Sequence, residues 1–115
     1  MKQVLIDTNF ILTCIKQKID FFEDLKLKGF EILIPKQIIR ELKGIKQLNA
    51  KLALKILEKN KFKEIDIGKG VVDKKIIKYL KDKKNILIAT LDKDLKEKLK
   101  NSKIIIKEKK RLSIQ

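Results

Sequence analysis

The sequence has no histidine and no tryptophan, and it contains a single cysteine, Cys14, and a single proline, Pro35. Structural zinc sites are built from cysteine thiolates and histidine imidazoles, so these absences exclude such a site, and one cysteine cannot form an internal disulfide. Cys14 is more simply explained as a small buried hydrophobic residue than as a reactive thiol. The low cysteine content leads us to expect a cytoplasmic protein.

Long apolar runs are also absent, since the longest stretches are only a few residues. This pattern predicts neither a signal peptide nor a membrane-spanning helix. Four glycines and one proline give no sign of a long linker. A length of 115 residues, 43% of them hydrophobic, suffices for one core. The sequence therefore predicts a single domain over residues 1–115.

Acidic residues are half as numerous as basic ones, 15 against 30, which gives a formal net charge of +15 at pH 7. Such an excess attracts polyanions, chiefly nucleic acids. Heat adaptation also enriches lysine, but it would enrich glutamate as well. A membrane surface is disfavoured because the basic residues are spread along the chain and no helix has a large aromatic face. Nucleic acid is the favoured partner.

Apolar periodicity predicts alternating strands and helices along the chain. The expected strands are 4–6, 31–34, 62–67, 85–89 and 104–106, followed by a basic tail. The expected helices are 8–28, broken near residues 18–20, and then 36–45, 49–60, 71–83 and 92–101. This alternation is typical of a three-layer α/β domain with a parallel sheet.

Two aspartates follow predicted buried strands. Asp7 ends the run Val4-Leu5-Ile6, and Asp92 comes shortly after Ile86-Leu87-Ile88-Ala89. Parallel strands share one carboxyl edge, where open α/β sheets bind ligands. The alternative is that Asp7, Thr8, Asn9 or Asp92 only caps the helix that follows.

Two further acids lie on predicted helices. Glu41 borders an apolar stripe and has no basic residue three or four positions away that could form a local ion pair. Asp73 shares its helical face with Ile76, Ile77 and Leu80, so we expect it on the apolar side, where an unpaired carboxylate is costly. The alternatives are a surface acid for Glu41 and a first-turn acid favoured by the helix dipole for Asp73.

Four converging carboxylates would repel one another unless a cation neutralised them. With only oxygen ligands available in number, the pattern favours Mg²⁺ or Mn²⁺ over zinc. Such ions activate water and stabilise a transferring phosphoryl group. An acidic metal pocket on a basic protein is what a nuclease requires.

The order of these motifs resembles the PIN-domain family of metal-dependent ribonucleases. The resemblance rests on Val4 to Asn9, on Ile34-Pro35 with Ile39 to Leu42, on Gly70 to Asp73, and on Ile88 to Leu95. The basic ending, residues 106–112, resembles the archaeal branch related to small-subunit rRNA-processing nucleases. The resemblance implies a Rossmann-like, five-stranded parallel sheet of order 3-2-1-4-5 with helices on both faces.

The same resemblance implies a set of site residues. Asp7, Glu41, Asp73 and Asp92 would bind one or two Mg²⁺ or Mn²⁺ ions and act in catalysis. Around them, ligands or water would be oriented by Thr8, Asn9 and Thr90, with Asp94 acting through water. The chain departs from the family pattern at Lys74 and Leu91, which puts substrate choice in question.

The favoured function is hydrolysis of single-stranded or preribosomal RNA by a cytoplasmic endoribonuclease. A non-catalytic RNA-binding or assembly module is the main alternative, and a toxin ribonuclease with an antitoxin partner is another. The sequence does not decide whether the chain forms a homodimer. A phospho-acceptor signalling domain ranks behind these, because Asp7 has no acidic neighbour.

Overall fold

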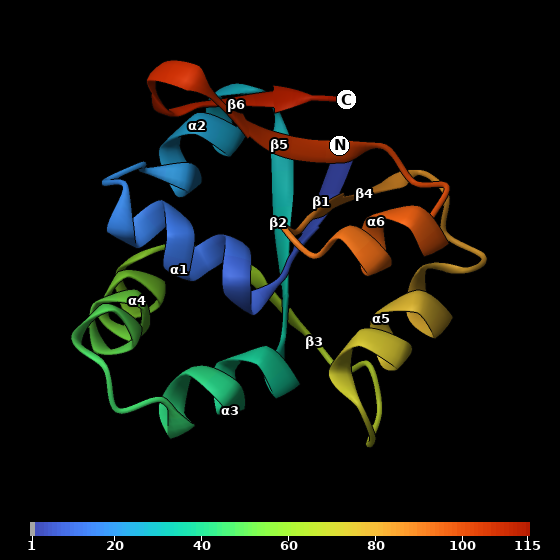
Figure 1. The fold of residues 1–115 in the computed structure, drawn as a ribbon, viewed down its shortest axis with the longest axis horizontal. Helices are drawn as coiled ribbons and strands as arrows, with labels where there is room; N and C mark the ends of the chain where they lie inside the picture. The colour runs from blue at the N-terminus through green and yellow to red at the C-terminus, as the bar shows by residue number, and fades with distance from the viewer. Residues whose placement is uncertain (1) are drawn as a thin grey trace.

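A central sheet divides the protein into three layers (Figure 1). The computed structural model describes residues 2–115, except for the side chain of Lys109. The strands are β1 Lys2–Ile6, β2 Phe30–Pro35, β3 Lys63–Ile65, β4 Ile86–Ala89, β5 Lys103–Lys107 and β6 Arg111–Ile114. They lie in the order β3-β2-β1-β4-β5-β6, and the first five run parallel. The predicted order of the parallel strands is confirmed.

Helices cover both faces of the sheet. They are α1 Thr8–Lys16, α2 Phe21–Leu27, α3 Lys36–Gly44, α4 Leu48–Lys59, α5 Val72–Leu80 and α6 Lys93–Lys98. Strand order reverses direction at β1, and right-handed crossovers then place the later helices on the opposite face from the earlier ones. Figure 1 shows α1, α3 and α4 on one side of β1 and β2, with α5 and α6 on the other. No helix in residues 2–115 combines the length and the apolar character needed to cross a membrane.

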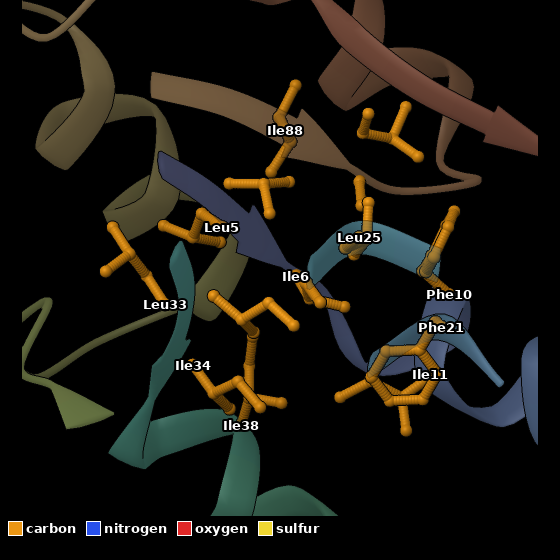
Figure 2. Close-up of a cluster of buried hydrophobic side chains, with 14 of the residues drawn as sticks. Leu5, Ile6, Phe10, Ile11, Phe21, Leu25, Leu33, Ile34, Ile38 and Ile88 are labelled. Atoms are coloured by element: carbon orange, nitrogen blue, oxygen red, sulfur yellow. The ribbon is translucent and has the colours of Figure 1, made fainter. Parts of the chain in front are cut away.

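The core is centred on β1. Val4, Leu5 and Ile6 are fully buried because helices pack on both faces of this strand, which explains its unbroken apolar run. Figure 2 shows Leu5 and Ile6 among buried side chains from β2, β4, α1, α2 and α3. A rigid central strand thus positions the residue that follows it, Asp7.

The first predicted helix is interrupted where the sequence analysis expected it. Lys18 has a φ of 59°, which ends the first piece, and the Asp20 side chain then accepts a hydrogen bond from the Glu23 N–H at the start of α2. Gly29, with a φ of 87°, follows that helix, as expected for a residue in the left-handed region. The break separates α1 from α2.

The basic tail predicted after β5 forms further structure instead. The chain turns through a short 3₁₀ segment, Glu108–Lys110, and returns as β6, antiparallel to β5. Leu112 faces the core and is 4% exposed. The sequence analysis missed this strand because the turn contains no glycine, asparagine or proline, and Lys110 takes the left-handed conformation that those residues usually supply.

Candidate active site

The carboxyl ends of β1 and β4 lie side by side. Ile6 is paired with Ala89 in the parallel ladder, and the backbone N–H of Asp7 donates to the Ala89 carbonyl at 3.0 Å. Asp7 and Thr90 are therefore neighbours at the same edge of the sheet. This is the switch point of the strand order, where α/β sheets bind ligands.

Asp7 is the most constrained acid of this edge. It is only 4% exposed, its Oδ2 accepts a hydrogen bond from Thr90 Oγ1 at 2.8 Å, and its Oδ1 accepts from the Thr8 N–H at 2.8 Å. Burial raises the pKa of Asp7, the two hydrogen bonds lower it, and the charges of Glu41 and Asp92 raise it. Asp7 is also the N-cap of α1, but the cap alone does not account for the bond to Thr90.

Glu41 is joined to this edge through Thr8. The Thr8 hydroxyl donates to Glu41 Oε1 at 2.8 Å, although the two residues lie 33 positions apart. Glu41 is exposed on α3. The ion pairs found in the described part of the chain are Lys28 with Asp24 and Lys36 with Asp66, so a surface ion pair does not explain the position of Glu41.

Asp92 is held by the turn that follows β4. Its N–H donates to Thr90 Oγ1 at 3.2 Å, and its Oδ1 accepts from the Leu95 N–H at 3.2 Å as the N-cap of α6. Asn9 steadies the same turn, because its Oδ1 accepts from the Leu91 N–H at 3.2 Å. Any residue other than proline at position 91 can make this backbone bond, so the departure at Leu91 leaves the turn intact.

Asp73 does not lie where its helical spacing predicted. The side chain is exposed rather than on the buried face, because Asp73 stands in the first turn of α5, next to the exposed Val71 and beyond the core-packed Ile76. It still faces the other acids. Partial burial raises the pKa of Asp73, the charges of Asp7 and Asp92 raise it further, and the charge of Lys98 lowers it.

Hydrogen bonds thus connect Asp7, Thr8, Asn9, Glu41, Thr90 and Asp92, and Asp73 joins them through its charge. Asp94 is exposed, and its side chain makes no hydrogen bond within residues 2–115. Lys74 is exposed on α5. The sequence analysis missed Lys98, because nothing distinguishes it from the many other lysines near it in the chain.

The chemistry of the donor set fits a divalent cation. All the candidate ligands are carboxylate oxygens, the type that Mg²⁺ and Mn²⁺ prefer. Burial raises the pKa values of Asp7 and Asp73, and the charges of neighbouring acids raise them further. A cation would relieve that repulsion. As the side chains of residues 2–115 stand, no three acidic or thiol groups are gathered closely enough to enclose an ion. Metal binding would therefore require acidic side chains at this edge to move closer together.

Comparison with known proteins identifies relatives of this chain. The sequence profile of the PIN like domain family matches residues 4–111. Ribonuclease VapC4 of Methanocaldococcus jannaschii is 33% identical over 129 residues, covering 99% of this chain and 97% of that protein. The rRNA-processing protein fcf1 of Schizosaccharomyces pombe is 34% identical over 102 residues, covering 84% of this chain and 53% of that protein.

A solved structure supports the same relationship. The PIN domain endonuclease Utp24 superimposes with a TM-score of 0.82 and 28% sequence identity, covering 96% of this chain and 90% of that one.

Proposed function

Because this chain belongs to the PIN-like domain family, we propose that it is a metal-dependent endoribonuclease that hydrolyses phosphodiester bonds in RNA. The observation that supports this most directly is the hydrogen-bond network at the ends of β1 and β4. It joins Asp7 to Glu41 through Thr8 and to the Asp92 turn through Thr90. Three acids from three separate segments are thereby oriented toward one edge of the sheet.

In this proposal Asp7, Glu41, Asp73 and Asp92 would hold one or two Mg²⁺ or Mn²⁺ ions. A bound ion of this kind activates water and offsets the charge that develops on a phosphoryl group. The protein's part is to orient Asp7 before the ion arrives. Thr90 Oγ1 and the Thr8 N–H fix both oxygens of Asp7, and each oxygen keeps an acceptor position free.

The threonines have distinct positioning roles. The Thr8 hydroxyl draws Glu41 from α3 toward β1, and Thr90 accepts from the Asp92 N–H while donating to Asp7. Such outer partners fix ligand geometry and are costly to remove. The net charge of +15 supplies the complementary property, attraction of the RNA backbone.

Ribosomal RNA precursors are one candidate substrate class. The yeast relative is named as an rRNA-processing protein. The second candidate is a toxin ribonuclease, favoured by the similarity to ribonuclease VapC4 over nearly the whole of both chains. Only the second role calls for an antitoxin partner. The toxin role would be supported if expression of this protein arrested growth and co-expression of a neighbouring gene relieved that arrest.

Cleavage of structured and single-stranded RNA in Mg²⁺ or Mn²⁺ tests the proposed activity, with EDTA as the metal-free control. Glu41→Gln should lose cleavage and keep the fold. Glu58→Gln is the matched control, because Glu58 is an exposed helical glutamate on α4, and it should cleave at the wild-type rate. Cleavage that persists in EDTA, or in Glu41→Gln, contradicts the metal mechanism. Absence of cleavage by folded, metal-bound wild type would favour a non-catalytic RNA-binding module.

A further inference from the structure

A hollow of about 570 Å³ opens between the carboxyl-terminal ends of α5 and α6. Buried Leu80, Leu99 and Asn101 line its floor. Its rim carries four exposed lysines, Lys81, Lys84, Lys98 and Lys100, and a single acid, Asp82. Figure 1 shows these two helices together on the side of the sheet away from α1, α3 and α4. The hollow is therefore a concave, positively charged surface.

The rim lysines are not needed to satisfy the helix ends. Lys83 Nζ already donates to the Tyr79 carbonyl at 3.1 Å, and Lys103 Nζ donates to the carbonyls of Leu99 and Asn101, both at 2.8 Å. The Asn101 amide donates to the carbonyls of Lys83 and Ile86.

The four rim lysines themselves form no ion pair or side-chain hydrogen bond with the residues that the structure describes. Four positive charges around one concave surface repel one another, and an anion from outside the chain would relieve this repulsion.

The hollow and the carboxylate edge, where Asp7, Asp73 and Asp92 lie, are at opposite ends of α5 and α6, because each helix begins beside an acid and ends at the hollow. Along α5, eight residues separate Asp73 from Lys81, about 12 Å at the rise of an α-helix. A polymer of phosphates could span both places, and acids that repel phosphate need a basic surface beside them to keep the strand bound.

We propose that the lysine-rimmed hollow between α5 and α6 seats the phosphate backbone of the RNA strand whose scissile bond lies at the carboxylate edge. This inference rests on the proposed ribonuclease function. The ligand is recognised as a run of phosphodiesters rather than as bases, since the hollow has lysines and no aromatic side chain among its lining residues.

Binding of a fluorescently labelled single-stranded RNA in EDTA tests the proposal without cleavage. The variant changes Lys81, Lys84, Lys98 and Lys100 to Gln. The control changes the same number of exposed lysines on and beside α4, namely Lys46, Lys51, Lys55 and Lys59. Both variants have the same net charge, so any difference reports on position. Thermal melting verifies that both remain folded.

The quantity to compare is the slope of log affinity plotted against log salt concentration. Each phosphate contact contributes about 0.7 to the slope for a single strand, so loss of the rim lysines should reduce the slope by about 2 to 3 and weaken binding at least about tenfold at low salt. The α4 control should change the slope by less than half as much. Equal changes in the two variants overturn the proposal, because they would show that charge acts without regard to place.

A charge change of the opposite sign sharpens the test. Asp82→Asn removes the one acid of the rim and should strengthen RNA binding, whereas Glu58→Gln on α4 should strengthen it less. A wild type that cleaves RNA while both rim variants match their controls would refute this inference and leave the proposed function standing. A wild type that neither binds nor cleaves RNA would refute both.

Discussion

The turns after β1 and β4 are built from the same few residue types and hold their acids in different ways. After β1 the acid, Asp7, comes immediately, is buried and is bonded on both oxygens. After β4 the equivalent place holds Thr90, and Asp92 follows two residues later, half-buried, as a helix N-cap. A donor thus stands opposite the buried acid, where a second carboxylate would have repelled it. The difference shows how two acids can approach one edge without sharing a buried position.

The largest expected effect is the loss of RNA cleavage when either turn loses its acid, because we expect the two acids to act together. Asp7→Asn and Asp92→Asn should each reduce metal-dependent RNA cleavage by about a thousandfold, and the double variant should be little worse. Asparagine remains a good N-cap, so the fold is retained in both. Single-turnover cleavage rates in Mn²⁺ measure this. Losses that multiply in the double variant would show that the two acids act independently.

Stabilisation by bound metal should depend on the acids of the two turns and not on Asp94. At a Mn²⁺ concentration of one hundred times Kd, binding stabilises the folded state by about 2.7 kcal/mol, which calorimetry detects as a higher Tm. Asp7→Asn should abolish that shift, and Asp94→Asn should leave most of it, because Asp94 is exposed and makes no bond to the network. Equal melting of wild type with and without Mn²⁺ would exclude a metal site.

The two threonines offer a smaller contrast. Thr90→Val leaves a buried carboxylate oxygen of Asp7 without its donor and should destabilise the protein by about 1–3 kcal/mol. Thr8→Val removes a bond to an exposed carboxylate, for which water substitutes, so its cost should be lower. Urea unfolding in EDTA measures both. A Thr8→Val cost as large as that of Thr90→Val would show that burial does not distinguish the two bonds.

The smallest effect is the pH dependence of the metal-free protein. The pKa of Asp7 is raised in the folded state, first by burial, so the folded form binds a proton more tightly than the unfolded form. The contribution of Asp7 to stability is therefore complete below its unfolded value of 3.8 and is lost as pH rises through the raised pKa.

Asp7→Asn should thus gain stability relative to wild type as pH rises above about 4, and exposed Asp73→Asn should gain less. Urea midpoints in EDTA across this range measure the difference. A constant difference between Asp7→Asn and wild type at all pH values would contradict the raised pKa.

The sequence predicted the positions of these turns well and their geometry less well. Unbroken apolar runs at Val4 to Ile6 and Ile86 to Ala89 indicated strands buried on both faces, and the order of the parallel strands followed the family resemblance. Asp73 was expected to be buried and is exposed, because helical periodicity gives an angle around the helix axis and not how far the core extends along that axis. The β6 strand was missed because its turn depends on a lysine in the left-handed region.

By itself the sequence determined a basic chain, an alternation of strands and helices, and acids at the ends of the central strands, because these depend on local composition and period. Only the tertiary structure decided that Thr90 donates to Asp7, that Thr8 reaches Glu41 across 33 positions, and that lysines from α5 and α6 rim one hollow. Such contacts join residues far apart in the chain. They arise when parallel strands share an edge and helices pack beside one another, which periodicity along the chain does not report.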